Sequence, residues 1–317
     1  MRYLITGGNG FIGSHITLRL LSEGHAVTVL DNFSTSPEGR LSNTSASVIK
    51  GSVNDENLLK GLIENCDYVI HLAAVVGVKL AMENGIDGLR LSCLGTDNIL
   101  KYASIFDKEV LVTSSSAIYG KITSNTVSEE DDSLIGCSNK PSWTYSIEKL
   151  AEEHMCLAYY REHNTKVKVC RLFNVIGPNQ SKHYGMVVPN FISCALKNEP
   201  LHVYGDGTHT RTFAYIDDVI DGLKTVMSNG KAGEVYNVGG TEEVSILELA
   251  NRIITLTHSS SMIEFVPFSQ VFGEKFEETR QRKPDIRKIS VLGYTPKYSL
   301  EDALLKIIEA IKQRGEF

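Results

Sequence analysis

Residues 1–31 constrain the fold of this chain more than any other stretch. A short apolar run leads into the sequence GGNGFIG, in which Gly7, Gly10 and Gly13 form a G-x-x-G-x-x-G pattern. An amphipathic segment at 14–23 follows, and a second apolar run comes after it. Strand, glycine turn, helix and strand in this order predict the first βαβ unit of a doubly wound parallel sheet.

The same stretch predicts a dinucleotide site. Glycines at the turn let backbone N–H groups approach a pyrophosphate at the N-terminus of the helix. The second apolar run ends at Asp31, and an acidic residue there suits ribose hydroxyls and disfavours a 2′-phosphate. We therefore predict NAD rather than NADP. A tight glycine turn in an ordinary α/β protein is the alternative, and the order of the surrounding segments argues against it.

Strand-like and helix-like segments alternate through the first half of the chain. This alternation predicts an α/β fold, a Rossmann-type doubly wound parallel sheet with helices on both faces. The strand-like runs lie near 48–50, 68–72, 110–113 and 167–172, and the helical segments near 57–64, 88–102 and 145–162.

The rhythm breaks after Asn174, where loops rich in Gly, Pro and Asn appear. We predict an NAD-binding Rossmann domain over 1–173, to which 213–239 returns with one more strand. A smaller C-terminal α/β substrate domain is predicted over 174–212 and 240–317.

Composition excludes several functional classes. Hydrophobic residues make up 42% and charged residues 22% of the 317 residues, and the net charge of −6 predicts no nucleic-acid partner. No apolar run approaches the roughly 20 residues of a membrane span, and no signal peptide is expected. The six cysteines are scattered without a C-x-x-C pair, which predicts no metal site and a reducing compartment. We therefore expect a cytoplasmic protein.

Tyr145 and Lys149 lie four residues apart in a segment predicted to be helical. On a helix both side chains share one face, and an ammonium near a phenol favours the phenolate. A free tyrosine has a pKa of about 10, so such a depression would make Tyr145 an acid and base at neutral pH. Two exposed residues of any helix can show this spacing. The dinucleotide site upstream favours the catalytic interpretation.

With these segments placed, the chain resembles the extended short-chain dehydrogenase/reductase family, and within it the NAD-dependent nucleotide-sugar epimerases and dehydratases. The resemblance covers nearly the whole chain. It rests on residues 7–13, 31–32, 71–74, 95–96, 114–120, 145–149, 171–178, 204–217, 236–239, 282–288 and 292–296.

The resemblance implies which residues form the site. Ser115 matches the catalytic Ser/Thr, and its hydroxyl would pass a proton between a sugar oxygen and Tyr145. NAD would be held by Gly7, Gly10, Phe11, Ile12, Gly13, Asp31, Asn32, Ser52, Val53, Leu72, Ala73, Ala74, Tyr145 and Lys149. The substrate would be held by Ser115, Ser116, Asn174, Val188, Tyr204, Arg211 and Arg282.

The substrate positions have implied roles. Arg211 matches an arginine that pairs with the substrate diphosphate, which suits a bidentate guanidinium, although a surface arginine is the alternative. Asn174 matches a residue near the same diphosphate, and Tyr204 an aromatic that lies against the nucleotide base. Arg282, or less favourably Arg280, would supply a second phosphate contact.

The loop after Ser115 indicates the branch of the family. A 4,6-dehydratase places Asp and Glu directly after the catalytic Ser/Thr, and a UDP-glucuronate decarboxylase also uses a Glu in this loop. Here the two positions are Ser116 and Ala117, which are not general acids or bases. The sequence therefore predicts a UDP-sugar 4-epimerase, an isomerase that acts through a transient 4-keto intermediate. UDP-glucose/galactose, their N-acetyl forms and uronic acids remain open as substrates.

Two alternatives stay open. A dehydratase or decarboxylase would recruit its acid and base elsewhere, and Glu148 is a candidate if the helix turns it inward. A non-catalytic NAD-binding sensor is less favoured, because such proteins typically lose the Tyr or the Lys. The choice of UDP over dTDP or GDP is implied by the family alone. So is a homodimer through 88–102 and 145–162.

Three positions depart from the family pattern. Ser52 stands where an Asp meets adenine, so Asp55 is an alternative contact. Ser92 stands where an Asn supports the surroundings of the catalytic lysine, and it could act through a water. Thr212 stands where an Asp commonly follows the diphosphate arginine.

Selectivity for the sugar is expected to depend on 75–79, Trp143 and 180–186. Lys182 and His183 in the last of these could meet a carboxylate, but solvated loop residues are the default interpretation.

Overall fold

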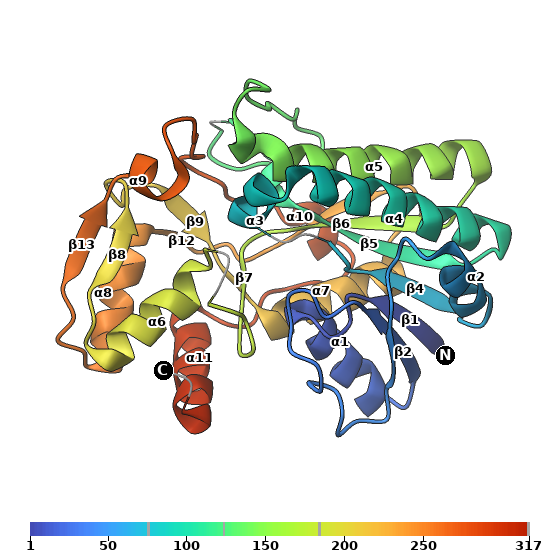
Figure 1. The fold of residues 1–317 in the computed structure, drawn as a ribbon, viewed down its shortest axis with the longest axis horizontal. Coiled ribbons are helices and arrows are strands. Elements are labelled where there is room, and N and C mark those ends of the chain that lie inside the picture. Colours follow the sequence, from blue (N-terminus) through green and yellow to red (C-terminus); the bar gives the residue numbers. More distant parts are fainter. Residues whose placement is uncertain (75–76, 123, 183–184, 316–317) are drawn as a thin grey trace.

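A seven-stranded parallel sheet forms the centre of the molecule (Figure 1). The structure, a computed structural model, describes residues 1–74, 77–122, 124–182 and 185–315. The strand order β11-β6-β5-β4-β1-β2-β3 is that of a doubly wound dinucleotide-binding sheet, so the predicted fold class is confirmed. The strands are β1 (Arg2–Thr6), β2 (Ala26–Asp31), β3 (Ser47–Lys50), β4 (Tyr68–His71), β5 (Glu109–Ser115), β6 (Val167–Leu172) and β11 (Val235–Val238).

Helices cover both faces of this sheet (Figure 1). Leu4 and Ile5 of β1 are both fully buried but belong to separate core clusters, because successive side chains of a strand point to opposite faces. Each face therefore has its own apolar core. One face carries α1 (Phe11–Ser22) and α7 (Ile216–Asn229), and the other carries α2 (Glu56–Glu64), α4 (Gly85–Ile105) and α5 (Thr144–His163).

A smaller group of elements lies beside the sheet (Figure 1). In it β8 pairs with β13 in parallel and β9 pairs with β12 in antiparallel. Its apolar side chains, including Phe191 and Leu304, join the core on the α1 face. The elements are α6 (Val187–Lys197), β8 (Leu201–Tyr204), β9 (Thr210–Thr212), β12 (Glu243–Ser245), α8 (Ile246–Thr257), β13 (Ile263–Val266), α9 (Phe268–Phe272) and α11 (Leu300–Arg314).

Several connections cross between the two groups. β11 pairs with β6, as expected for a segment that returns to the main sheet. The short helix α10 (Arg287–Ser290) packs on β11 and α7, although the sequence assigned this stretch to the substrate domain. The domain boundary at 173 stays a prediction. The remaining elements are α3 (Val78–Glu83), η1 (Ser116–Tyr119), η2 (Pro141–Trp143), β7 (Val175–Ile176) and β10 (Ala214–Tyr215).

The described residues were searched for membrane-spanning helices and for metal-binding clusters. Among them, no helix has the length and apolarity needed to cross a bilayer. A search of the same residues finds no cluster of side chains able to hold a metal ion.

Candidate active site

The glycine turn between β1 and α1 forms a backbone cradle. Gly7 has a φ of +69°, and a Cβ added there would lie 2.8 Å from the backbone nitrogen of Ala73. A Cβ at Gly13 would lie 2.2 Å from the carbonyl oxygen of Gly7. Larger residues would therefore clash with fixed backbone. Only glycine permits a turn this close to the end of β4, which leaves the helix N-terminus open to a pyrophosphate.

Asp31 joins this turn to the loop after β2. Its Oδ2 accepts a hydrogen bond from the backbone N–H of Asn9 at 2.9 Å, and its Oδ1 accepts one from the backbone N–H of Phe33 at 2.8 Å. The buried carboxylate therefore holds both loops in place while lining the cavity beside them. This placement fits the role predicted for it at the adenosine ribose.

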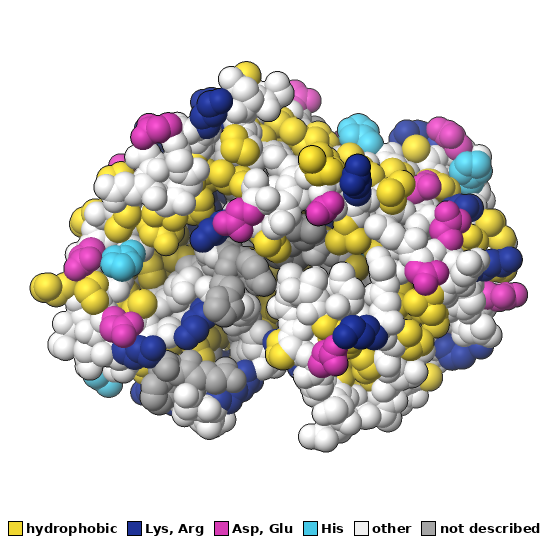
Figure 2. Space-filling view, viewed as in Figure 1, with side chains coloured by type: hydrophobic (Ala, Val, Ile, Leu, Met, Phe, Trp, Pro, Cys, Tyr) yellow, Lys and Arg dark blue, Asp and Glu magenta, His cyan; other side chains and the backbone are white. Residues whose placement is uncertain are grey.

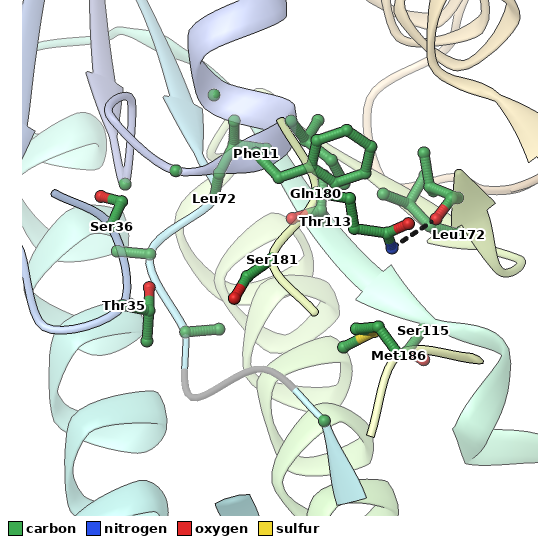
Figure 3. Close-up of a pocket in the computed structure, with 18 of the residues that line it drawn as sticks. Phe11, Thr35, Ser36, Leu72, Thr113, Ser115, Leu172, Gln180, Ser181 and Met186 are labelled. Carbon is green, nitrogen blue, oxygen red and sulfur yellow. Dashed lines mark hydrogen bonds between the residues drawn. The ribbon is translucent and has the colours of Figure 1, made fainter. Parts of the chain in front are cut away.

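A cavity of about 420 Å³ opens at the carboxyl ends of the parallel strands. Figure 3 shows Thr35 and Ser36 at one end of it and Ser115 and Met186 at the other. All residues predicted to hold the cofactor line this cavity, as do the predicted substrate residues Ser115, Ser116, Asn174, Val188 and Arg282. Tyr204 and Arg211 are not among its lining residues.

Tyr145 lies half-buried in the first turn of α5, near Ser115 at the end of β5. Burial raises the pKa of Tyr145, while Lys149 and the Ser115 hydroxyl act to lower it. The net direction is opposite to the depression that the spacing predicted. Desolvation in the cavity wall outweighs the neighbouring ammonium, and the sequence does not reveal that desolvation. The two predicted stabilisers of the phenolate are nevertheless in place.

Lys149 is buried one turn further along α5. Its Nζ donates hydrogen bonds to the carbonyl oxygen of Thr113 at 3.2 Å and to Oε2 of Glu152 at 2.8 Å. Burial lowers the pKa of Lys149, but Glu152 and Tyr145 outweigh it, so the net shift is upward. The ammonium is therefore held in its charged form beside the tyrosine.

Glu148 and Glu152 were not predicted to flank the lysine as a pair. Both are almost completely buried against α4, which confirms that the helix turns Glu148 inward. Glu148 is not among the cavity-lining residues. A four-residue spacing places both carboxylates on one helix face, and that signal was available in the sequence.

Arg282 lines the cavity, as does Arg40. Its Nη2 donates to Oγ1 of Thr279 at 2.8 Å, and its buried Nε has no partner among the described residues. Burial and the neighbouring Arg211 lower the pKa of Arg282 to about 10, so it remains cationic at neutral pH. Arg280 is exposed and lies outside the lining, which favours Arg282 for the phosphate contact.

Arg211 and Tyr204 are engaged elsewhere. Arg211 forms an ion pair with Glu278, and its Nη1 donates to the carbonyl oxygen of Thr210 at 2.7 Å. Tyr204 lies edge-on to Phe272, with ring centroids 5.7 Å apart. Their roles at the diphosphate and base stay predictions.

Two residues that the sequence suggested for the site, Trp143 and Asp55, do not line the cavity. Trp143 is buried away from the cavity, with its Nε1 donating to Oε2 of Glu277 at 2.8 Å, so it does not shape the sugar site directly. Asp55 caps α2 by accepting from the backbone N–H of Leu58 at 3.0 Å, and it does not line the cavity. Lys182 is exposed, and residues 75, 76 and 183 lie outside the described residues.

The stretch 180–186, expected to affect sugar selectivity, contributes Gln180, Ser181, Gly185 and Met186 to the cavity lining, whereas Ser34, Thr35, Ser36 and Arg40 are lining residues that the sequence did not single out. Arg40 donates to the carbonyl oxygens of Asn9 and Asn179, at 3.3 Å each, and so bridges the glycine turn and the second loop. Gln180 donates to the carbonyl oxygen of Val175 at 2.9 Å (Figure 3). Arg40 follows Asp31 closely in the sequence, but nothing in the sequence indicates that it contacts Asn179, 139 residues further along the chain.

The parallel sheet, the glycine cradle and the Ser115–Tyr145–Lys149 group define an NAD-dependent enzyme of the extended short-chain dehydrogenase/reductase type. The chain belongs to the NAD-dependent epimerase/dehydratase family, whose model matches residues 3–239.

Relatives narrow the possibilities. The chain is 40% identical to the UDP-N-acetyl-alpha-D-glucosaminuronate decarboxylase of Bacillus cytotoxicus, over 98% of each chain. It is 37% identical to UDP-glucuronic acid decarboxylase 1 of Danio rerio, over 99% of this chain and 73% of that one. The UDP-glucuronic acid 4-epimerase of Bacillus cereus, in complex with UDP-glucuronic acid and NAD, superposes with a TM-score of 0.89 and 30% identity. That match covers 99% of this chain and all of the other. These relatives support NAD as cofactor, and they favour the decarboxylase alternative over the predicted 4-epimerase.

Proposed function

We propose that the protein uses NAD to oxidise C4 of a UDP-hexuronate and then releases the carboxylate as carbon dioxide, giving a UDP-pentose. The observation that carries this proposal is the pairing of Ser115 and Tyr145 in the cavity of a chain so similar to a hexuronate decarboxylase. The nucleotide-sugar names of the relatives support a UDP-sugar as the substrate.

The lack of an acid at Ala117 does not count against decarboxylation. A ketone at C4 of a hexuronate lies β to the carboxylate, so the electron pair of the breaking C5–C6 bond moves onto the C4 oxygen. Hydroxyl donors from Ser115 and Tyr145 at that oxygen would stabilise the enolate. Elimination of water, in contrast, needs a general acid and a general base. Ser116 and Ala117 therefore argue against a dehydratase but not against a decarboxylase, contrary to the expectation from the sequence.

The remaining residues have complementary roles in the proposal. Tyr145 takes the proton of the C4 hydroxyl and later returns it, while the Lys149 ammonium stabilises the phenolate. NAD supplies the hydride acceptor at C4 and gives the hydride back. Arg282, a half-buried residue, would offer its guanidinium to the substrate diphosphate.

A second candidate function is epimerisation at C4 of the same UDP-hexuronates. The close structural match to a UDP-glucuronic acid 4-epimerase favours it. Both reactions begin with oxidation at C4. Decarboxylation then breaks the C5–C6 bond, whereas epimerisation leaves it intact.

One experiment separates the candidates. The purified protein is incubated with NAD and either UDP-glucuronate or UDP-N-acetylglucosaminuronate, while NMR follows the sugar and a coupled assay follows carbon dioxide. We expect a UDP-pentose with one carbon dioxide released per turnover. A C4 epimer without carbon dioxide would instead establish the second candidate. A 4-keto-6-deoxy sugar formed from UDP-glucose would contradict both.

We also propose a homodimer formed through α4 and α5. Figure 2 shows hydrophobic side chains at the surface over these helices. Ile86, Leu94 and Ile147 are exposed there. Light scattering should give twice the 35.0 kDa chain mass, and an Ile147→Glu variant should give the chain mass itself. A wild-type protein that elutes at the chain mass would contradict the dimer.

A further inference from the structure

Two carboxylates are buried behind the catalytic lysine, between α5 and α4. Glu148 is 0% exposed and Glu152 is 1% exposed, and they lie one helical turn apart on the same face. Oε2 of Glu152 accepts the Lys149 ammonium at 2.8 Å. Oε1 of Glu152 and both oxygens of Glu148 accept no hydrogen bond from the described residues. Charged carboxylates in such surroundings are poorly solvated, so at least one of them favours its protonated form.

The sequence of α4 makes room for this pair. A Cβ added at Gly88 would lie 2.5 Å from Oε1 of Glu148, so only glycine leaves the space that this carboxylate occupies. One turn further along α4, the buried Ser92 lies beside Glu152; burial raises the pKa of the Glu152 carboxyl, and Ser92 only partly offsets this. Ser92 is the position at which the sequence departs from the asparagine of the family pattern. The shorter side chain and the two glutamates therefore form one local arrangement.

The charged groups around the pair leave Lys149 as its nearest cation. On α5 the adjacent Glu153 raises the pKa of Glu152 but is itself paired with Arg171 at 2.9 Å. On β4 the buried His71 is neutral, because burial first and Lys149 second lower its pKa to about 3. The other groups near the pair are Tyr145, Cys93 and Cys156, and the charged residues Lys79, Glu83, Asp87 and Arg90 of α3 and α4 are exposed.

Glu148 therefore titrates close to neutral pH. Burial raises its pKa to about 7, with Lys149 lowering it and Glu152 raising it. Two carboxylates that share one ammonium cannot both ionise freely, so one proton is retained in the cluster. The half-buried Cys93 lies near both glutamates, on the side of α4 toward solvent.

Decarboxylation creates a demand for such a proton. The C5–C6 bond breaks, its electron pair stays on the sugar as an enolate, and C5 must then take up one proton. Tyr145 takes a proton from the C4 hydroxyl and must return one to the same oxygen at the end of the cycle. Each turnover therefore consumes one proton from outside the sugar. Epimerisation at C4 consumes none.

We propose that Glu152 positions Lys149 and that Glu148 and Glu152 together store the proton that replaces, through Lys149, the proton which Tyr145 donates to C5 in each decarboxylation. This inference rests on the proposed decarboxylase activity. Neither glutamate lines the cavity, so both act through Lys149 as positioning and proton-storing residues.

The experiment compares Glu148→Gln and Glu152→Gln with the wild-type protein, measuring carbon dioxide release against pH. In the wild-type protein kcat should fall as the pH rises through about 7, because Glu148 loses its proton there. Glu148→Gln should lose this step and lower kcat on the order of tenfold at pH 6. Glu152→Gln should move this fall in kcat to lower pH, because the charge of Glu152 no longer raises the pKa of Glu148. In both variants the slowed protonation should leave reduced cofactor in the site, seen as absorbance in the NADH band.

Controls separate this role from a structural one. Glu162→Gln changes an exposed glutamate at the far end of the same helix and should leave the pH profile unchanged. Glu148→Asp keeps a titrating carboxyl and should restore the limb near neutral pH, which loss of packing alone would not allow. Melting temperatures show whether each variant is folded.

The outcomes distinguish the inference from the proposed function. Wild-type carbon dioxide release with an unchanged pH profile in both Gln variants would overturn the inference and leave the decarboxylase standing. A wild-type protein that releases no carbon dioxide from either hexuronate would overturn the proposed function, and the inference with it.

Discussion

Replacing Asp31 by Asn should weaken the fold and cofactor binding together. Each carboxylate oxygen accepts one backbone N–H, from Asn9 at 2.9 Å and from Phe33 at 2.8 Å. An asparagine has only one acceptor oxygen, so at least one of these N–H groups faces an amide nitrogen. Leaving a buried donor unpaired costs about 1–3 kcal/mol. Because the Asn9 donor belongs to the glycine turn, the lost hydrogen bond would also loosen the cradle.

Asp31→Asn should also weaken NAD binding directly. A hydrogen bond to a charged group contributes about 1.5–3 kcal/mol, and a change of about 1.4 kcal/mol is tenfold in affinity. Loss of the carboxylate at the ribose should therefore raise the Kd for NAD by roughly 10–100-fold. The preference for NAD over NADP should narrow, because the negative charge that repels a 2′-phosphate is gone.

Calorimetric titration of NAD and NADP, with melting curves of the apoprotein, measures both effects. At roughly 2–4 °C per kcal/mol, the melting temperature should fall by several degrees. Asp55→Asn is the matched control, because Asp55 caps α2 outside the cavity and asparagine caps helices equally well. If Asp31→Asn binds NAD as tightly as the wild-type protein and melts at the same temperature, the role assigned to Asp31 is wrong.

Three further predictions concern the site. Tyr145→Phe should lower kcat by roughly 10²–10⁴-fold with a near-normal melting temperature, and NMR of the product measures it; activity near the wild-type level would remove Tyr145 from the mechanism. Arg282→Ala should weaken binding of UDP at least about tenfold by calorimetry, whereas Arg280→Ala should not, since a charge-assisted contact contributes about 1.5–3 kcal/mol. The folded-state pKa of Glu148, about 7, lies above the ordinary 4.5, so its contribution to stability is full below pH 4.5 and declines as the pH rises to about 7. Denaturant titrations of the wild-type protein and Glu148→Gln at pH 5 and 7.5 test this, and equal pH dependence in both would contradict it.

The sheet and its main helices were predictable because they are encoded locally. The alternation of apolar runs and amphipathic segments fixed the strands and helices to within a few residues, as with β6 (Val167–Leu172) and α5 (Thr144–His163). The cofactor-binding residues could also be predicted from the sequence, since the glycine turn and Asp31 belong to one continuous stretch. Segments at 177–188 and 277–282 were harder to place. They are held by partners far along the chain, such as Arg40, which donates to the carbonyl oxygen of Asn179.

The pKa of Tyr145 shows a second limit of sequence reasoning. The four-residue spacing correctly placed Lys149 beside it, and Lys149 does act to lower its pKa. The net shift is upward because burial dominates, and the four-residue spacing carries no information on burial. A spacing predicts which groups meet, but the sign of a pKa shift also requires the solvent exposure of each group.

Glu152 and Glu153 of α5 show how the helix decides the chemistry of two identical neighbours. A step of about 100° between them turns Glu153 toward β6, where its Oε2 accepts Nη2 of Arg171 at 2.9 Å. Glu152 turns toward α4 and Lys149 instead, and burial raises the pKa of its carboxyl. Glu153 is thus a structural partner, whereas Glu152 raises the pKa of Lys149, the lysine that we propose to act in catalysis. The absence of an acid at Ala117 and the presence of two acids behind Lys149 both favour decarboxylation over elimination of water. Protons can reach this site from the side of the lysine rather than from the loop over the sugar, which suits a reaction that takes up one proton and eliminates no water.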